Sequence, residues 1–235
     1  MEHYHLTPIA IVHSPFREKF TTPRQAGQTP SIKATIEFLP AFSSAETIRE
    51  LETFSHLWLL FVFHQHLDRG WHPTVRPPRL GGNRRVGVFA SRSPFRPNPI
   101  GLSAVRLLNI RLSSGTLFLD VQGVDLIDKT PIVDIKPYVP YADSIPDALG
   151  GFANARPESR LDIDFTDEAR QQLKDFAQHT PELETLIRET LCLDPRPAYR
   201  HQDNDQHAYG CLLDRYNVRW QIEGNRAIVN DIRMV

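Results

Sequence analysis

The sequence contains few of the residues that build disulfide frameworks or metal sites. Its two cysteines, Cys192 and Cys211, are too few for a disulfide framework or, by themselves, for a metal site. Inert buried thiols are the expectation. The ten histidines are scattered, and none belongs to an HExxH or Cys-linked spacing typical of zinc. We therefore expect no metal centre.

Long hydrophobic runs are also absent. The longest, residues 57–63, is far shorter than the roughly 20 residues of a membrane-spanning helix. The N-terminus lacks the basic stretch and long apolar core of a signal peptide. With 40% hydrophobic and 23% charged residues, the composition is ordinary for a folded globular protein. These features predict no membrane association and a cytoplasmic location.

No GxGxxG motif follows a strand and opens a helix, so a doubly wound nucleotide-binding fold is not indicated. Short strands are predicted instead at residues 6–12, 33–39, 58–63, 85–90, 103–110, 116–121 and 131–135. The apolar run at 58–63 is typical of a strand buried on both faces. Only residues 45–54 resemble a helix in this region. Many short strands with few helices favour a mainly β fold, with a closed or strongly curved sheet.

A second unit is expected after a change in composition. Residues 141–160 are rich in Pro, Gly, Ala and Asp, as in a loop or linker. Beyond them, Thr166 can cap a helix that runs to about residue 178, and a second helix is predicted at 181–192. The end of the chain alternates and carries a hairpin signal at Glu223-Gly224-Asn225. We therefore expect an N-terminal β domain, 1–150, and a small α+β domain, 160–235.

Acidic residues are missing from Arg69 to Leu119, a stretch that holds nine arginines and no lysine. Arginine offers a planar fork of donors that suits phosphate and can stack on bases. The pattern favours a polyanion such as RNA, but pairing with acidic residues elsewhere in the fold would explain it too. The candidate RNA-binding residues are Arg69, Trp71, Arg76, Arg79, Arg84, Arg85, Arg96 and Asn98. Trp71 could be a stacking platform or a core residue.

Proline-rich segments at 76–82 and 93–101 punctuate the same stretch. Proline fixes φ and restricts the preceding residue, so these loops should be rigid. A rigid loop is suited to recognition at low entropic cost, although a stiff connector would have the same composition.

Asp134, Lys136 and Tyr138 would share one face of an extended segment, because side chains alternate along a strand. A carboxylate, an ammonium and a phenol on one face could move a proton or polarise a substrate. Surface salt bridging explains the same residues equally well.

Several separated motifs together resemble one family. They are Ser14-Pro15-Phe16, Pro23-Arg24-Gln25, Ser55-His56-Leu57-Trp58, Phe63-His64-Gln65, Arg76-Pro77-Pro78 and the segments 93–101 and 130–138. In this order and spacing, they resemble the TsaA-like tRNA methyltransferases (the TrmO family), in the longer bacterial form with a C-terminal domain.

The resemblance implies a small β-barrel, a homodimer and S-adenosylmethionine as methyl donor. It implies N6-methylation of N6-threonylcarbamoyladenosine at position 37, in the anticodon loop of tRNA. Residues implied to contact the donor are Pro23, Arg24, Gln25, His64, Gln65, Arg92, Leu102, Asp125, Leu126, Ile127 and Asp128. The family usually has Gly where this chain has Lys129, which would cost about 1 kcal/mol if φ there is positive.

Three hypotheses follow. In the first, the chain is a methyltransferase in which Asp134 or Tyr138 serves as base or proton relay, and Lys136 either assists the Tyr138 phenol or holds the threonyl carboxylate. In the second, it is a non-catalytic tRNA-binding module. In the third, it is a hydrolase that uses His64 and Asp134, although no nucleophile motif is present.

Overall fold

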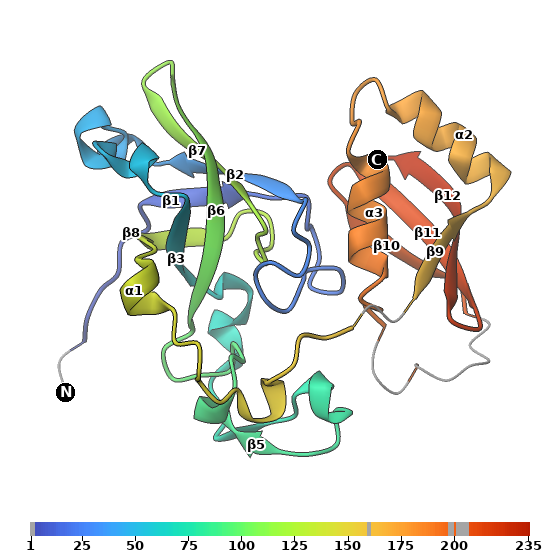
Figure 1. Cartoon of the computed structure of the whole chain (residues 1–235), viewed down its shortest axis with the longest axis horizontal. Coiled ribbons are helices and arrows are strands. Elements are labelled where there is room, and N and C mark those ends of the chain that lie inside the picture. The colour runs from blue at the N-terminus through green and yellow to red at the C-terminus, as the bar shows by residue number, and fades with distance from the viewer. Residues whose placement is uncertain (1–2, 159–160, 197–199, 201–206) are drawn as a thin grey trace.

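The computed structural model describes residues 3–158, 161–196, 200 and 207–235. The chain forms an N-terminal β-barrel and a C-terminal sheet covered by helices, joined by an extended segment (Figure 1). The mainly β expectation, with an α+β unit at the end, is confirmed. Within the described ranges, no helix is long and apolar enough to cross a membrane.

Six antiparallel strands close the barrel in the order β1-β2-β7-β6-β3-β8. Their bounds are β1 Ala10–His13, β2 Lys33–Phe38, β3 His56–Val62, β6 Ile100–Ser113, β7 Thr116–Gln122 and β8 Pro131–Pro137. Buried and less buried residues alternate along β1, β2, β3 and β7. A strand with one face in a packed interior requires this period of two.

The prediction that the 58–63 run is buried on both faces is wrong. In β3, Leu57, Leu59 and Phe61 are buried, whereas Trp58 and Leu60 are only half-buried. A barrel has a single interior, so alternate residues of the run fill it and the residues between them form an apolar outer face.

Two further predictions are wrong. Residues 45–54 form two short 3-10 helices, η2 (Ala45–Ile48) and η3 (Leu51–Thr53), separated by Glu50 at a φ of 67°. Ile48 and Leu51 pack only partly buried against the core, and the left-handed backbone at Glu50 interrupts the helix between the two turns. Residues 85–90 contain only a two-residue strand, β5 (Val86–Gly87), followed by a 3-10 turn.

A long excursion between β3 and β6 carries seven of the nine arginines of the stretch without acidic residues. It contains η4 (His64–Arg69), β4 (Thr74–Val75), η5 (Pro78–Leu80) and η6 (Val88–Ala90), and β4 pairs with β5. The remaining short helices are η1 Pro40–Phe42, α1 Pro140–Asp143 and η7 Gly151–Ala153.

The C-terminal unit is a four-stranded sheet in the order β10-β11-β12-β9 with two helices. The elements are β9 Asp162–Phe165, α2 Asp167–Phe176, α3 Leu183–Leu191, β10 Tyr209–Leu213, β11 Tyr216–Glu223 and β12 Arg226–Met234. The Thr166 side chain caps α2 by accepting from the Ala169 amide, and Gly224 makes the expected hairpin turn at a φ of 61°.

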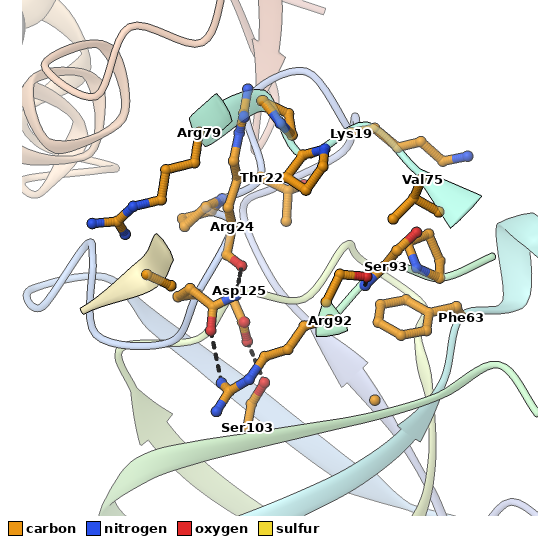
Figure 2. Close-up of a pocket in the computed structure, with 18 of the residues that line it drawn as sticks. Lys19, Thr22, Arg24, Phe63, Val75, Arg79, Arg92, Ser93, Ser103 and Asp125 are labelled. Carbon is orange, nitrogen blue, oxygen red and sulfur yellow. Dashed lines mark hydrogen bonds between the residues drawn. The ribbon is translucent and has the colours of Figure 1, made fainter. Parts of the chain in front are cut away.

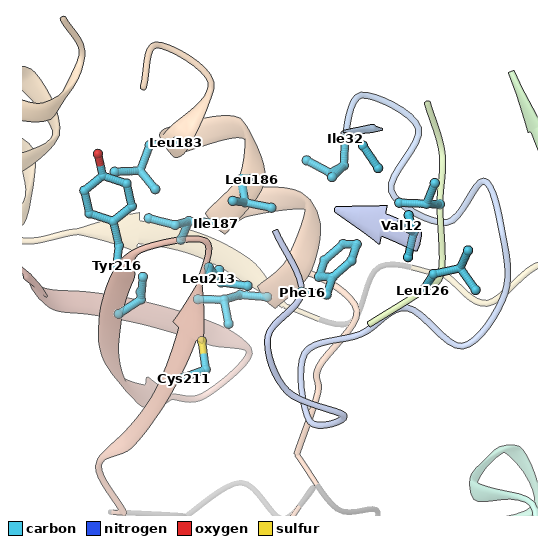
Figure 3. Packing of buried hydrophobic residues seen from close by; sticks show 14 of the residues in the cluster. Val12, Phe16, Ile32, Leu126, Leu183, Leu186, Ile187, Cys211, Leu213 and Tyr216 are labelled. Atoms are coloured by element: carbon cyan, nitrogen blue, oxygen red, sulfur yellow. The ribbon is translucent and has the colours of Figure 1, made fainter. Parts of the chain in front are cut away.

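The two units share one hydrophobic core (Figure 3). Phe16 is fully buried and forms a β-bridge with Leu213 of β10. The Asp214 amide donates to the Pro15 carbonyl at 2.7 Å. Because continuous packing and backbone hydrogen bonds join the units, we infer that their relative orientation is fixed.

Candidate active site

A cleft of about 1860 Å³ opens beside the barrel (Figure 2). Its walls come from the loop at residues 19–28, the end of β3 with η4, the excursion before β6, and the turn at 125–127. The linker at 150–157 and the end of α3 also line it. Segments far apart in the sequence therefore meet in one concave site, as in most small-molecule sites.

Arg92 and Gln25 meet inside this cleft. The Arg92 Nη1 donates to Gln25 Oε1 at 2.7 Å, and the Gln25 Nε2 donates to the Arg24 carbonyl at 2.6 Å. The Arg24 amide donates to Gln28 Oε1 at 3.1 Å, which closes the loop on itself. These bonds hold a guanidinium at the cleft, where a carboxylate or phosphate could bind it.

Asp125 supplies a carboxylate close to that guanidinium. The Ser103 Oγ donates to Asp125 Oδ1 at 2.6 Å, and Ser103 is itself 3% exposed. Burial raises the Asp125 pKa to about 6, against the opposing effects of the Ser103 hydrogen bond and the Arg92 charge. A carboxylate held dry in this way is suited to accept from a ligand hydroxyl or to face a cation.

The cleft brings together ten of the eleven residues that the resemblance assigns to the methyl donor. These are Pro23, Arg24, Gln25, His64, Gln65, Arg92, Leu102, Asp125, Leu126 and Ile127. Asp128 does not line the cleft. Its carboxylate accepts from the Ser14 amide at 3.2 Å and lies 3.7 Å from Arg17, so it holds the turn in place.

Lys129 has a φ of 66°, in the left-handed region. The backbone therefore keeps the conformation that a glycine would adopt easily, at a cost of about 1 kcal/mol for the lysine. Its Nζ lies 2.9 Å from His13 Nδ1. Neither residue lines the cleft.

The predicted RNA-binding residues divide into two groups. Arg76, Arg79, Arg85 and Arg96 line the cleft, whereas Arg69, Trp71, Arg84 and Asn98 do not. Trp71 is 54% exposed, so its alternative role as a core residue is wrong.

Several of these arginines stabilise the loops that carry them. Arg96 donates to the Ser91 carbonyl at 2.8 Å, Arg85 donates to Thr74 Oγ1 at 3.1 Å, and Arg79 donates to the Ala155 carbonyl. In the part of the chain that the structure describes, Arg111 is the only one of the nine in an ion pair, with Asp120. Pairing with distant acids therefore does not explain the basic stretch.

Asp134, Lys136 and Tyr138 lie outside the cleft, on the outer face of β8. Lys136 Nζ is 2.9 Å from Asp134 Oδ2, and the Tyr138 ring packs 5.5 Å from the Trp58 ring. The shared face predicted for these residues is thus present. None of the three lines the cleft, and a hydrolase that combines His64 with Asp134 in one chain is therefore not supported.

The pairing of β8 with β3 and of β3 with β6 gives the distance between Asp134 and the cleft. Asp134 pairs with Leu60 of β3, and Leu60 pairs with Leu102 of β6, which lines the cleft. Two strand spacings amount to about 10 Å. Within one chain, the Asp134 face lies beside the cleft and not in it.

Two protein-family models match the chain, one for each unit. The tRNA-methyltransferase O N-terminal domain matches residues 11–144, and the TrmO C-terminal domain matches residues 158–235. The chain belongs to the TrmO family.

Two bacterial relatives of the TrmO chain match over nearly their whole length. The Escherichia coli K12 tRNA (adenine(37)-N6)-methyltransferase is 46% identical over 222 residues, 94% of each chain. A Pseudomonas aeruginosa protein named putative S-adenosylmethionine-dependent methyltransferase RcsF is 44% identical, covering 92% of this chain and 91% of the relative. A crystal structure of TrmO from Pseudomonas aeruginosa aligns with a TM-score of 0.81 at 36% identity, over 100% of this chain and 99% of the other.

Other relatives match over a shorter part of the chain. The mouse tRNA (adenine(37)-N6)-methyltransferase is 42% identical over 139 residues, 58% of this chain and 31% of the relative.

Several residues that line the cleft were not predicted from the sequence. Three of them come from loops and one from η4, namely Lys19, His72, Phe95 and His66. The C-terminal unit contributes Thr190, Leu193, Asp194 and Pro195. The Asp194 and Arg196 side chains, both almost fully buried, form a 2.8 Å ion pair that fixes this second wall. No local pattern marks these residues, because only tertiary packing places them together. No group of three potential ligands in the described chain could hold a metal ion.

Proposed function

We propose that this chain methylates N6 of adenosine 37 in tRNA with S-adenosylmethionine as methyl donor. The observation that carries the proposal is the meeting of Arg92, Gln25 and Asp125 in one cleft, at positions that the family resemblance assigns to the donor. The names of the Escherichia coli and Pseudomonas aeruginosa relatives support the same reaction for this chain.

The residues of the cleft fit the chemistry of this donor. Guanidinium groups from Arg24 and Arg92 match a methionine carboxylate. The dry Asp125 carboxylate can accept from ribose hydroxyls, and Leu102, which is 49% exposed, offers apolar surface. The donor supplies an electrophilic methyl group on a positively charged sulfur.

Positioning is the main contribution expected from the protein. Methyl transfer by in-line displacement needs the two reactants held in line and shielded from water. The bond from Ser103 to Asp125 and the bond from Arg92 to Gln25 fix the ligand-binding groups in advance, which lowers the entropic cost of binding.

In its finer form, the proposal names N6-threonylcarbamoyladenosine as acceptor. Its N6 belongs to a urea whose lone pair is delocalised, so removal of the N6 proton should assist attack. Asp134 or Tyr138 would take that proton. Lys136, 2.9 Å from Asp134, would assist whichever group accepts it. This role requires the outer face of β8 to lie against a cleft, and within one chain it does not line one.

A homodimer would meet that requirement. Part of the outer face of β6 and β3 is apolar: Leu102 is 49% exposed and lies in a row with the half-buried Leu60, next to Trp58. An apolar sheet face of this kind is typical of an interface. A second copy on this face would bring its own Asp134 close to the first copy's cleft.

The charge distribution supports RNA on the barrel side. Residues 1–160 carry 18 basic and 14 acidic side chains, whereas residues 161–235 carry 9 basic and 14 acidic ones. RNA phosphates favour the basic half. The anticodon loop, with unstacked bases, would enter at the rim formed by Arg76 and Arg79. Such an enzyme would act in the cytoplasm.

The test is incubation of the purified protein with methyl-labelled S-adenosylmethionine and tRNA with or without the threonylcarbamoyl group. Label in N6 of adenosine 37 of the modified tRNA alone supports the full proposal. Equal label in both tRNAs would exclude N6-threonylcarbamoyladenosine as the required acceptor and would still support methylation of adenosine 37. Binding of tRNA without any label would favour the non-catalytic module.

A further inference from the structure

A row of aromatic rings lines one wall of the cleft, and none of its residues is among those that the family resemblance assigns to the donor. The ring centroids of Phe63 and His66 are 6.5 Å apart, those of His66 and Phe95 are 5.1 Å apart, and those of Phe95 and His72 are 5.3 Å apart. All four residues line the cleft. Aromatic walls of this kind bind unpaired bases by stacking.

Lys19 stands beside this row. Its Nζ lies 3.3 Å from His66 Nε2 and 3.4 Å from the Gln65 carbonyl oxygen. In Figure 2, Lys19 and Phe63 lie to the right of Arg92, whereas Arg24 and Arg79 lie to its left. The aromatic wall and the Arg24 side are thus separate parts of one cleft.

No carboxylate neutralises this corner. Among the described residues, neither Lys19 nor Arg69 forms an ion pair. Burial and the Lys19 ammonium lower the pKa of His66, which keeps the imidazole neutral near pH 7. Burial and the Arg69 guanidinium lower the pKa of Lys19 in turn. An anion placed beside Lys19 would relieve the mutual repulsion.

Three other cations of the cleft are less available. Arg79, Arg85 and Arg96 donate to groups of the protein's own loops and linker. Within the described part of the chain, Lys19 donates to a carbonyl and an imidazole, both neutral, so a ligand carboxylate can replace them favourably.

We propose that this corner is the acceptor site, in which the target adenine lies against the Phe63–His66–Phe95–His72 row and Lys19 binds the carboxylate of the amino acid attached to it. The inference rests on the proposed function and deepens it. It makes Lys19 a specificity-determining residue that distinguishes the modified adenosine from a plain one.

The test compares two anticodon stem-loop RNAs. One carries N6-threonylcarbamoyladenosine, and the other carries the same nucleoside with its carboxylate blocked as a methyl ester. We expect wild-type kcat/KM to be about tenfold or more higher for the acid, as for a charge-assisted hydrogen bond. Lys19→Met should lose that preference by slowing the acid alone, and Lys19→Arg should retain part of it.

Lys174→Met is the matched control, because Lys174 is exposed on α2 and lies outside the cleft. It should leave both rates unchanged. Phe95→Leu should slow both RNAs by roughly tenfold, and Lys19→Met should leave the Kd for S-adenosylmethionine unaltered.

The outcomes separate the possibilities. Equal wild-type rates on acid and ester overturn the carboxylate site and leave the methyltransferase in place. Equal slowing of both RNAs by Lys19→Met assigns Lys19 to an RNA phosphate, and a weakened donor Kd assigns it to the donor; either result overturns the inference. An unchanged rate in Phe95→Leu overturns the stacking wall. A wild-type protein that methylates neither RNA refutes the proposed function, and this inference with it.

Discussion

Arg92 and Gln25 are 67 residues apart in the sequence, yet Arg92 Nη1 donates to Gln25 Oε1 at 2.7 Å across the cleft. One residue lies in the loop after η6 and the other in the loop between β1 and β2. Their contact joins two of the segments that the family resemblance singles out. The site that we propose for the methyl donor is therefore assembled before any ligand arrives.

Asp125→Asn should stabilise the protein while it weakens the donor site. Because the folded-state pKa of about 6 lies above the ordinary value of 3.8, the ionised Asp125 destabilises the native state fully above pH 6. This cost declines as the pH falls from 6 toward 4. Urea unfolding at pH 7.5 should show a gain of about 1–3 kcal/mol for Asp125→Asn, and the gain should shrink at pH 4.5.

Asparagine can still accept from Ser103, so the variant keeps the 2.6 Å hydrogen bond and isolates the charge. The same variant should bind S-adenosylmethionine more weakly at pH 7.5. A variant that is less stable than wild type at pH 7.5 would contradict this account of Asp125.

Phe16→Ala should destabilise both units together. Phe16 is fully buried and lies against Leu213 of the C-terminal sheet, so the truncation leaves a cavity at the interface. The expected loss in the free energy of unfolding is about 3–5 kcal/mol, in one cooperative transition measured by urea denaturation.

Leu149→Ala serves as its control, since Leu149 is 95% exposed, and should change stability by less than about 0.5 kcal/mol. Two separate transitions in the wild-type protein would show that the shared core does not couple the units.

Much of the architecture was predictable, because alternation and turn residues are local signals. Strands β2, β7 and β8 lie within two residues of the predicted ranges. The failure at 45–54 has a backbone cause: the segment has helical spacing, but Glu50 takes a left-handed φ of 67° that divides it into two short turns. The burial of β3 was misjudged because an apolar outer face and a buried face look alike in sequence.

The site was predictable only in part. Ten of the eleven residues that the family resemblance assigns to the methyl donor line one cleft, whereas Asp128 supports the turn beside it. Lys19 and His66 carry no signal of their own, since their 3.3 Å contact joins residues 47 positions apart. The wall formed by Thr190 and Pro195 could not be predicted, because it depends on how the two units pack.

The proposed dimer can be tested by complementation. If Asp134 serves the cleft of the second copy, Asp134→Asn and Arg92→Met should each be inactive, but a mixed dimer would contain one intact cleft. Equal mixing, with exchange of subunits, should restore about a quarter of wild-type kcat, by random pairing in a two-fold symmetric dimer.

Tyr138→Phe, mixed with Arg92→Met, should behave in the same way if the phenol takes part. Full activity of both Asp134→Asn and Tyr138→Phe, with unchanged pH profiles, would remove these residues from the chemistry. Inactive variants whose mixture stays inactive would place their role within a single chain.

The most direct measurement is calorimetric titration of S-adenosylmethionine into the wild-type protein and into Arg92→Met. The wild type should bind one donor per chain, and removal of the guanidinium should weaken binding by about 10- to 100-fold, as expected for the loss of a charge-assisted hydrogen bond. Absence of binding to the wild type, or equal affinity of the two proteins, would contradict the assignment of this cleft to the methyl donor.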